Sequence, residues 1–306
     1  MNKPISMRLS EIISESELKL IRDGAFEALG LLDSPVTSSI LTFVSDARFI
    51  KQFGENVSCV ICSPDVVPEI PAHVGVATSL NPKMAFFELH NRLSTAAPLA
   101  RAQFSTVVGY NCSIHNLACI AETNVRIGNN VVIEEFVSIK ENTVIGNNVI
   151  IRAGTIIGGE GYYFIRVSED TTMPVQHFGG VIIEDDVEIQ QGCAFDRAYF
   201  PWDDTVIGQG SKIDNLVHAA HAVKIGKSVF ITSCVSIAGN VRIGDNMYIG
   251  PGSTFSNNIT AGDDSRVSLG SVVVRNIAEE STVTGNFAIE HSIFMNELKE
   301  RFKKHS

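Results

Sequence analysis

The residues best suited to chemistry lie in one short segment, Asp214-Asn215-Leu216-Val217-His218-Ala219-Ala220-His221. Two of the eight histidines of the chain stand three positions apart here. An imidazole changes its charge near neutral pH, so it can take a proton from an attacking group as a general base. A single histidine is usually only a polar surface residue, but a pair that follows Asp-Asn is more suggestive. We therefore predict that His218 or His221 is catalytic.

The composition excludes several classes of function. The chain has 306 residues and a formal charge of −10, whereas a general nucleic-acid binder needs a basic face to neutralise phosphates. Hydrophobic residues make up 44% of the chain, yet no apolar run approaches the roughly 20 residues that span a bilayer. Residues 1–6 lack the apolar core of a signal peptide. We expect a cytoplasmic protein with no transmembrane segment and no nucleic-acid partner.

The six cysteines are expected to be thiols, because disulfides are rare in the cytoplasm. Cys59 and Cys62 form a Cys-x-x-Cys pair, but neither a second pair nor a histidine at metal-ligand spacing accompanies it. The apolar run around them indicates a buried strand, in which cysteine acts as a small hydrophobic residue. We predict no metal site.

An internal repeat of six residues determines the fold. A period of six fits neither a helix, with 3.6 residues per turn, nor an array of hairpins. It fits a parallel β-helix, in which one side chain per hexad points inward and Gly, Asn and Asp form tight corners. The hexad positions are Ile127, Ile133, Ile139, Ile145, Ile151, Ile157, Ile183, Ile189, Phe195, Ile207, Ile213, Ala219, Ile225, Ile231, Ile237, Ile243, Ile249, Phe255, Val267 and Val273.

The repeat also predicts which residues stack. Three hexads make one coil of 18 residues, and neighbouring coils lie about 4.8 Å apart. Gly239 follows His221 by 18 residues and is therefore expected one coil above it. A glycine there lets a substrate approach the backbone, and its N–H could donate to an oxyanion. Ala219 takes the inward position, so His218 and His221 should flank it near corners, facing solvent or a neighbouring subunit.

Two long excursions interrupt the repeat. The first, between Ile157 and Ile183, is rich in glycine and aromatic residues. The second, between Phe195 and Ile207, holds the only tryptophan, Trp202. Long excursions from a rigid scaffold are commonly functional or form interfaces, but they can also merely cover neighbouring coils. The sequence leaves both interpretations open.

The two ends of the chain lack the hexad, which suggests three parts. We expect an α/β domain over residues 1–105, the β-helix over residues 106–285, and a C-terminal helical segment over residues 286–306. The helix itself is predicted over residues 289–303.

The first part contains recognisable helix and strand signals. Residues 40–44 are a strand candidate, and Ser45 or Asp46 can cap a helix that begins at Ala47. Residues 82–90 are predicted to form a second helix, with a proline in its first turn.

Taken together in chain order, a set of segments carries a family resemblance. They are residues 41–43, 46, 49, 81–86, 158–162, 180–183, 196–197, 203–205, 214–221 and 237–239. These segments resemble UDP-3-O-acylglucosamine N-acyltransferase of lipid A biosynthesis and related hexapeptide-repeat nucleotide-sugar N-acyltransferases. The resemblance spans nearly the whole chain, and it implies a left-handed β-helix and a homotrimer. The expected fold is thus mainly β, with a small N-terminal α/β domain and a short C-terminal helix.

The resemblance implies roles for three residues in catalysis. The general base falls on His221 and the glycine of the oxyanion hole on Gly239. Asp214 could orient the imidazole. The implied reaction is acyl transfer from a thioester to a sugar amine, in which no metal takes part.

The resemblance also implies how substrate is bound. The aromatic pair that sandwiches the nucleotide base falls on Phe43 and Phe49, with Asp46 at a base-recognition position. Further substrate-binding positions are Asn215, His218 and Asn258.

At several positions the chain departs from the family. Asn258 stands where lipid A enzymes carry a second histidine near the substrate phosphates. Asp46 replaces an asparagine and Phe49 a tyrosine. Residues 285–288 instead resemble the ending of acyltransferases that modify amino sugars for surface polysaccharides. The reaction type is unaffected, but the choice between lipid A and another surface glycan stays open, as do the sugar, the uridine or thymidine nucleotide and the acyl length.

The implied co-substrate is an acyl-phosphopantetheine thioester, carried by acyl-carrier protein or by CoA, with no cofactor bound permanently. Carrier proteins are acidic, so docking one would need a local basic patch. The basic run over residues 299–304 could contribute, although cations at a helix C-terminus are equally explained by the helix dipole.

Two other classes of function remain as alternatives. A zinc site of the carbonic-anhydrase type needs three imidazoles, for which His177, His218 and His221 are the only plausible trio. A non-enzymatic β-helix would use its N-terminal domain only to dock a partner.

Overall fold

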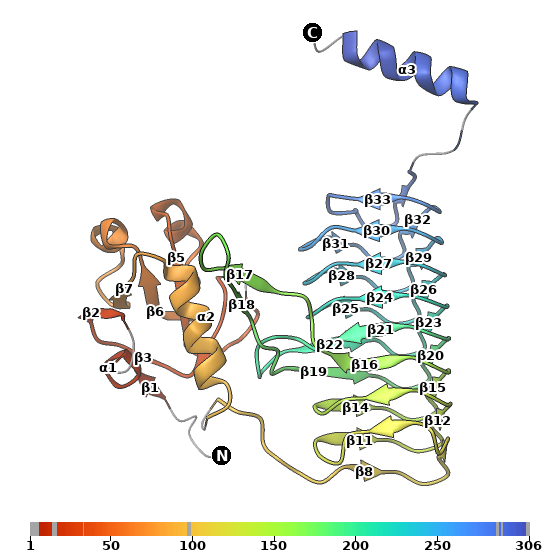
Figure 1. Cartoon of the computed structure of the whole chain (residues 1–306), viewed down its shortest axis with the longest axis horizontal. Coiled ribbons are helices and arrows are strands. Elements are labelled where there is room, and N and C mark those ends of the chain that lie inside the picture. Colours follow the sequence, from red (N-terminus) through yellow and green to blue (C-terminus); the bar gives the residue numbers. More distant parts are fainter. Residues whose placement is uncertain are drawn as a thin grey trace.

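The computed structural model describes residues 6–13, 17–32, 34–96, 99–285, 288 and 290–303. Most of the chain forms a tall stack of short strands, and a smaller α/β part lies beside this stack (Figure 1). Within these described ranges, no helix is long and apolar enough to cross a membrane.

The stack is a parallel β-helix with three faces, which the chain visits in turn. Face 1 consists of β8 (Val107–Val108), β11 (Val125–Ile127), β14 (Thr143–Ile145), β19 (Gly180–Ile183), β22 (Asp204–Ile207), β25 (Lys224–Ile225), β28 (Arg242–Ile243) and β31 (Thr260–Ala261). Face 2 consists of β9 (Ser113–Ile114), β12 (Val132–Ile133), β15 (Ile150–Ile151), β20 (Glu188–Ile189), β23 (Lys212–Ile213), β26 (Phe230–Ile231), β29 (Tyr248–Ile249), β32 (Arg266–Val267) and β34 (Thr282–Val283). Face 3 consists of β10 (Cys119–Ile120), β13 (Ser138–Ile139), β16 (Ile156–Gly159), β21 (Ala194–Asp196), β24 (His218–Ala219), β27 (Ser236–Ile237), β30 (Thr254–Phe255) and β33 (Val272–Val273). The predicted fold class is confirmed.

The hexad residues fill the core of this prism. Every hexad position named above is buried, with at most 6% of the residue exposed. Residues one coil apart pair in register, as Ala219 does with Ile237, so the six-residue period places like positions above one another. Burying one branched aliphatic side chain contributes roughly 1.5–3 kcal/mol, and the stack repeats this contribution along its whole length.

Asparagine forms many of the tight corners. Asn130 and Asn148 have φ angles of 58° and 57°, in the left-handed region that asparagine tolerates better than most residues. Their side chains also bond along the stack, with Asn130 Nδ2 donating to Asn148 Oδ1 at 3.0 Å. The corner residues therefore both turn the chain and tie successive coils together.

The N-terminal part is built on a five-stranded sheet in the order β2 (Lys19–Arg22), β7 (Gly75–Thr78), β6 (Val57–Cys62), β5 (Ile40–Val44) and β4 (Ala28–Leu29). Only the β2–β7 pair is antiparallel. A small antiparallel pair, β1 (Met7–Arg8) with β3 (Ala25–Phe26), lies beside it. The helical elements are α1 (Leu9–Ile12), the 3-10 helices η2 (Ala47–Gln52) and η3 (Pro64–Glu69), and α2 (Pro82–Leu93).

Most local predictions for this part are confirmed. The strand over residues 40–44 and the helix from Pro82 are present, and Asn81 caps the helix by accepting from Met84 N–H. The segment from Ala47 is a helix of the 3-10 type with Asp46 as its cap, so the prediction was right in place but not in helix type.

The Cys-x-x-Cys pair lies in a buried strand, as predicted. Cys59 and Cys62 are both fully buried on β6. Burial is the main reason that the pKa of each thiol is raised to about 11. Thiols held in this protonated form are poor nucleophiles and poor metal ligands.

The two excursions join the N-terminal part to the β-helix. The first forms an antiparallel hairpin of β17 (Phe164–Arg166) and β18 (Thr172–Pro174), which lies between α2 and the coils in Figure 1. Trp202 of the second donates its indole N–H to the carbonyl of Leu29 at 2.8 Å. Phe200 packs edge-on against Phe86 of α2, with ring centroids 6.3 Å apart. The excursions therefore form an interface and do not merely cover coils.

The C-terminal helix α3 (His291–Lys303) stands beyond the last coils (Figure 1). The prediction began it at residue 289, which lies outside the described residues, as do Asn286, Phe287 and Lys304. We retain the domain boundaries at residues 105 and 285 as a proposal.

Candidate active site

His221 and Gly239 are in direct contact on neighbouring coils. His221 follows β24, and Gly239 follows β27, the next strand of the same face. A Cβ atom on Gly239 would lie 2.3 Å from Cε1 and 2.5 Å from Nε2 of His221, closer than real atoms approach. The imidazole thus occupies the space that a side chain at position 239 would need. The predicted stacking of these two residues is confirmed.

The backbone around Gly239 leaves its amide available to a ligand. The Gly239 carbonyl accepts from Asn258 N–H at 3.1 Å, and Asn240 N–H donates to the carbonyl of His221 at 3.0 Å. We find no hydrogen bond from the N–H of Gly239 itself to any described residue. An amide with no protein partner beside an imidazole suits the stabilisation of an oxyanion.

Three aromatic rings from the excursions surround His221. Tyr163 lies nearly parallel to the imidazole, with ring centroids 6.1 Å apart and 13° between the planes. Tyr199 approaches edge-on at 5.1 Å, and the ring of His177 lies at 5.6 Å. His221 is half-buried, and its Nδ1 is buried with no hydrogen-bond partner among the described residues. The rings therefore fix the orientation of the imidazole.

These surroundings keep His221 neutral. Burial is the largest cause, followed by the nearby His177, and together they lower the pKa of His221 to about 4, against the opposing charges of Asp196 and Asp203. The unprotonated imidazole is the form that accepts a proton. His221 is thus unprotonated and able to accept a proton at neutral pH. The lowered pKa also makes it a weaker base than an ordinary histidine.

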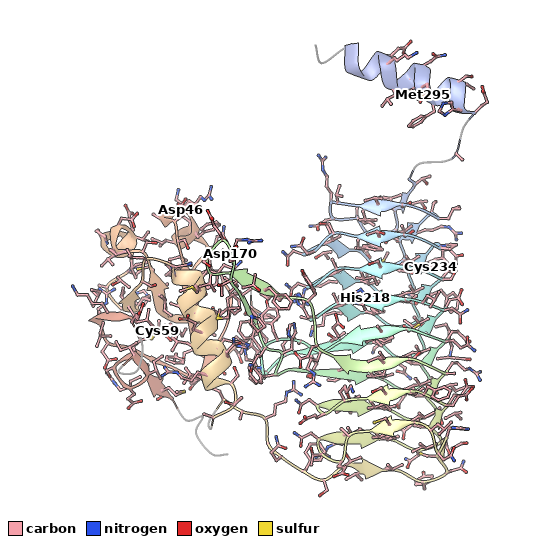
Figure 2. The ribbon with its side chains drawn as sticks, viewed as in Figure 1. Asp46, Cys59, Asp170, His218, Cys234 and Met295 are labelled. Atoms are coloured by element: carbon pink, nitrogen blue, oxygen red, sulfur yellow. The ribbon has the colours of Figure 1, made fainter. Side chains whose placement is uncertain are left out.

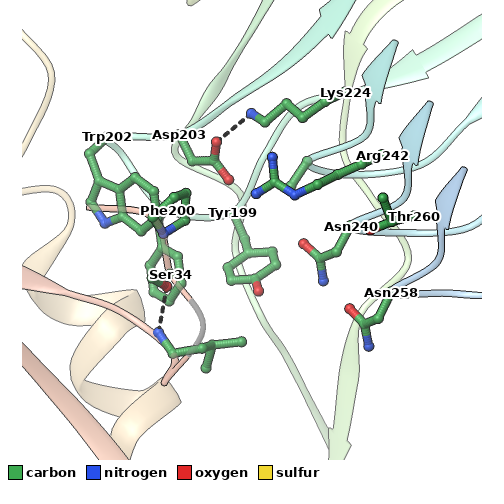
Figure 3. Close-up of a pocket in the computed structure, with 13 residues that line it drawn as sticks. Ser34, Tyr199, Phe200, Trp202, Asp203, Lys224, Asn240, Arg242, Asn258 and Thr260 are labelled. Carbon is green, nitrogen blue, oxygen red and sulfur yellow. Dashed lines mark hydrogen bonds and ion pairs between the residues drawn. The ribbon is translucent and has the colours of Figure 1, made fainter. Parts of the chain in front are cut away.

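A groove of about 210 Å³ opens between the N-terminal part and the coils (Figure 3). One wall carries Tyr199, the same ring that contacts His221, together with Trp202. The other wall carries Ala222, the residue after His221, and Asn240, the residue after Gly239. His221 does not line the groove itself. Its neighbour in space, Tyr199, and its neighbour in sequence, Ala222, both do.

The groove carries cations and amides. Lys224 is paired with Asp203 at 2.5 Å. The guanidinium of Arg242, in contrast, forms no ion pair or hydrogen bond within the described ranges, and only the backbone N–H of Arg242 is bonded, to the carbonyl of Ile259 at 2.8 Å. Asn240 and Asn258 project toward the open space from successive coils (Figure 3). A free guanidinium beside amide donors is a suitable environment for phosphate oxygens.

His218 is placed apart from His221. Its Nε2 lies 3.1 Å from Asp196 Oδ2, and the hydrogen bond to this carboxylate raises the pKa of His218 although burial opposes it. The side chain is 46% exposed on the outer surface of face 3. Of the two candidate histidines, only His221 contacts the glycine. A substrate-binding role for His218 stays a prediction.

The structure does not support the expectation that Asp214 orients His221. Asp214 follows β23 and lies at the corner between faces 2 and 3, whereas His221 lies at the corner between faces 3 and 1. The Asp214 carboxylate instead accepts from the backbone and side-chain N–H groups of Asn215, at 2.7 and 2.9 Å. The width of one face separates the two residues, so Asp214 could orient His221 only from another protomer.

The residues predicted to bind the nucleotide base lie on the N-terminal part, where Figure 2 labels Asp46 well away from His218 on the β-helix. Phe43 packs against Phe86 of α2 at 5.2 Å, and Phe49 lies under the guanidinium of Arg48 at 4.9 Å. Asp46 accepts from the backbone N–H of Arg48 at 2.9 Å and pairs with the Arg48 side chain. Phe43 and Phe49 belong to different hydrophobic clusters, and their binding of a base stays a prediction.

Comparisons with known proteins bear on the fold and on the class of enzyme. Residues 124–159 match the family model for the bacterial transferase hexapeptide (six repeats). UDP-3-O-acylglucosamine N-acyltransferase of Helicobacter hepaticus is 30% identical over 195 residues, and that of Paracidovorax citrulli is 29% identical over 205 residues. The chain resembles a nucleotide-sugar N-acyltransferase. The matches cover 54% and 63% of this chain and span only 55% and 61% of those relatives.

A solved structure supports the fold of this acyltransferase-like chain. UDP-N-acetylglucosamine acyltransferase from Campylobacter jejuni superposes with a TM-score of 0.53 at 22% identity, over 60% of this chain and 68% of the other. Such a likeness establishes the β-helix and says nothing of substrate.

The zinc alternative finds no support. His177 lies beside His221, but His218 is bound to Asp196 on the outer surface. Within the described part of the chain, no group of three or more His, Cys, Asp or Glu residues could hold a metal ion. The trio of imidazoles that the alternative needs is not assembled.

Sequence reasoning missed several residues of this acyltransferase-like site. Arg242 and Asn240 could have been found, because they lie 18 residues after Lys224 and Ala222 and so must stack on them. Tyr163 and Tyr199 could not, because the excursions that carry them have no repeat to relate them to His221.

Proposed function

We propose that this protein transfers an acyl group from a thioester to the amine of a nucleotide-linked amino sugar. The observation that carries the proposal is the contact between a neutral imidazole, His221, and a glycine with a free amide, Gly239, beside a groove that offers an unpaired cation. The names of the relatives support the same reaction and suggest the amine of a UDP-3-O-acylglucosamine as acceptor.

The proposed reaction assigns one step to each of the two residues. The amine nitrogen attacks the thioester carbon, and Nε2 of His221 takes the proton that the nitrogen loses. The carbonyl oxygen becomes an oxyanion, to which the N–H of Gly239 donates. When the tetrahedral intermediate collapses, the C–S bond breaks, and the proton held by His221 returns to the departing thiolate. An amide and a free phosphopantetheine thiol result.

The groove is proposed to hold the phosphates of the nucleotide sugar. Arg242 offers a guanidinium with no competing carboxylate among the described residues, and Asn258 offers an amide where the related lipid A enzymes use a histidine. The sugar amine would then lie toward Tyr199 and Ala222, next to His221. The base itself would lie on the N-terminal part, at Phe43, Asp46 and Phe49.

Several finer features belong to the same proposal. The donor is acyl-carrier protein or acyl-CoA, the nucleotide is UDP or dTDP, and the product enters lipid A or another surface glycan. The protein works in the cytoplasm, where these thioesters are found, and it holds no permanent cofactor. Lys299 of α3 would contribute to docking an acidic carrier protein.

We further propose that the active unit is a homotrimer. Large apolar side chains are exposed on the prism, with Phe230 at 52% and Val272 at 66% on its flat faces and Phe136 at 66% at a corner. Burying such surface against copies of the chain is favourable, and a neighbouring face would also close the outer side of His221. Light scattering of the purified protein gives the stoichiometry directly.

The proposal is tested by assaying purified protein with UDP- and dTDP-amino sugars against both acyl-carrier-protein and CoA thioesters. We expect amide product with at least one pair, and a fall in kcat of about 100-fold or more in His221→Ala. His73→Gln, which changes an exposed histidine of the N-terminal part, should retain full activity. Activity that survives loss of the His221 imidazole would contradict the assignment, as would the absence of product with every pair.

A further inference from the structure

One corner of the β-helix holds large apolar side chains in a strained backbone conformation. At the corner between faces 2 and 3, Phe136 and Leu216 both have a φ angle of 60°. This left-handed conformation is unfavourable for a bulky side chain, and the other described residues that adopt it are Gly, Asn, Asp, Ser, Ala, Cys or Glu. Packing within the chain does not offset the strain, because Phe136 is 66% and Leu216 is 62% exposed.

Other exposed apolar side chains extend this corner into a ridge. Leu117, between β9 and β10, is 54% exposed, and Leu269, between β32 and β33, is 56% exposed. We call Leu117, Phe136, Leu216 and Leu269 the corner ridge. Among the described residues at the corner between faces 1 and 2, only Tyr110 is a large apolar side chain with comparable exposure. Apolar surface that gathers along one line of a protein commonly marks a contact with a partner.

Face 3, on one side of the corner ridge, is almost without charge. Its outward side chains pair in register from strand to strand, and they are Cys119, Ser138, Ile156, Ala194, His218, Ser236, Thr254 and Val272. Among the described strand residues of this face, Asp196 alone is Lys, Arg, Asp or Glu, and it is bonded to His218. The centre of a protein interface is depleted in charged residues, so face 3 has the composition of a covered surface.

Face 2, on the other side of the ridge, complements face 3 in size. Its outward row places Phe230 and Tyr248 on neighbouring coils, and Phe230 is 52% exposed. The strands of face 3 that follow in the same two coils present the small residues Ser236 and Thr254. To match both rows, a partner needs side chains repeated at the coil spacing of about 4.8 Å, and a second copy of this chain has that spacing.

We propose that copies of the chain meet at the corner ridge, with face 3 of each copy packed against face 2 of the next. In a closed ring of identical copies, each copy presents one of these faces to one neighbour and the other face to the other neighbour. The strain at Phe136 and Leu216 is then offset by apolar contacts that form only on assembly. The assignment rests on the proposed homotrimer and locates its contact surface.

The same arrangement supplies a missing wall of the candidate active site. His221 follows the face 3 strand of His218 and lies at the end of this face that is remote from the ridge. Strands of the same coil lie level in a ring whose axis follows the stack, so Lys212 of the partner subunit is level with His218. Phe230 of the partner subunit is likewise level with Ser236, one coil above. A single copy therefore presents His218 and His221 on an open surface, and assembly converts this surface into a cleft.

Crosslinking tests the position of the ridge without substrate. Cys234 is exposed at the same corner, and its N–H donates to the carbonyl of Asn215, the residue before Leu216, at 3.0 Å. Cys119→Ser removes the other exposed cysteine and serves as the background. A short bis-maleimide should give covalent dimers of Cys119→Ser on a denaturing gel, and Cys119→Ser/Cys234→Ser should give none.

Light scattering of ridge variants gives the second readout. Phe136→Asn/Leu216→Asn introduces the residue that Asn130 and Asn148 show to be compatible with a left-handed corner, so the fold should be retained by circular dichroism. We expect this variant to be monomeric where the wild type is a trimer, and Leu216→Asn alone replaces it if it does not fold. Tyr110→Asn, at the corner between faces 1 and 2, is the matched control and should remain a trimer. Acyl-transfer activity of the monomeric variant should fall about tenfold or more, because one wall of the cleft is lost.

The outcomes separate this assignment from the proposed function. A monomeric wild type overturns it, as does a folded double variant that is still a trimer. A trimer in which Cys234 forms no crosslinks also overturns it, whatever the activity. Crosslinks through Cys234 in a protein that acylates no amino sugar would support the assignment and count against the proposed function alone.

Discussion

The contact of Gly239 with His221 shows at the scale of single residues how the fold makes the site. Two positions 18 residues apart must lie one above the other in a three-faced coil, so the spacing alone predicts their contact. The same reasoning could not find Tyr163, Tyr199 or His177. These rings come from excursions in which no period relates sequence distance to distance in space, and their contact with His221 depends on how the excursions pack.

Adding one methyl group at Gly239 should displace the base. Gly239→Ala would set a Cβ atom 2.3 Å from a ring that Tyr163 and Tyr199 hold in place, so the imidazole must move. The backbone of Gly239 is outside the left-handed region, so alanine itself causes no strain. We expect kcat to fall about 10- to 100-fold, as for other small misplacements of a catalytic group, with thermal stability little changed. Gly159→Ala, whose Cβ would meet only ordinary contacts at 3.6 Å, is the matched control.

The unpaired guanidinium of Arg242 should contribute to binding of the nucleotide sugar and not to the acyl-transfer step. Arg242→Gln removes a charge from the groove, so KM for the nucleotide sugar should rise about tenfold with kcat nearly unchanged, and the salt dependence of KM should weaken. Arg266→Gln provides the comparison, because Arg266 also opens a two-residue strand but lies on face 2, over the ring of Tyr248. Equal effects of the two substitutions would remove the groove from the proposed mechanism.

At the scale of elements, the hexad predicts the strands of the coils and their stacking, but it predicts little about the N-terminal part and the excursions. Strand β5 and helix α2 were predictable from their own sequences, because a β-branched run and a capped amphipathic segment are local signals. The segment from Ala47 was not fully predictable, because a cap such as Asp46 signals where a helix begins but not whether it is of the α or the 3-10 type.

The packing within one face gives a further prediction. On face 3, Ala219 pairs with Phe195 on one side and Ile237 on the other, so the small residue compensates for the large ring. Ala219→Ile should lower the free energy of unfolding by about 1–3 kcal/mol through overpacking, as measured by urea denaturation. Adding Phe195→Leu to that variant should recover part of the loss, although Phe195→Leu alone is destabilising. Strictly additive effects would show that the two side chains do not compete for space.

For the whole molecule, the junction between the N-terminal part and the β-helix determines how the protein responds to acid. His90 of α2 is fully buried, with Nε2 2.9 Å from the carbonyl of Gln176 and Nδ1 3.2 Å from Ser94 Oγ. Burial, despite the opposing bond to Gln176, lowers the pKa of His90 to about 4. His90 therefore belongs with His221 to a group of neutral histidines at one interface, held there by α2 and the excursions.

This interface should make stability fall as the pH falls. The unfolded chain protonates His90 below a pH of about 6.5, whereas the folded protein holds it neutral down to about pH 4, so stability is lost progressively through this window. The loss between pH 7 and pH 5 should be about 2 kcal/mol from this residue alone, measured as the difference in urea unfolding free energy. His90→Gln should reduce the pH dependence by that amount. His218 has a raised pKa, so its bond to Asp196 stabilises the folded protein more at low pH and opposes the effect of His90. Because the His218 side chain is 46% exposed, its contribution to the free energy of unfolding is small. A wild type equally stable at pH 5 and pH 7 would contradict this prediction, because it would mean that His90 gains a proton without loss of this packing. The excursions could then not hold His221 as rigidly as the proposed mechanism requires.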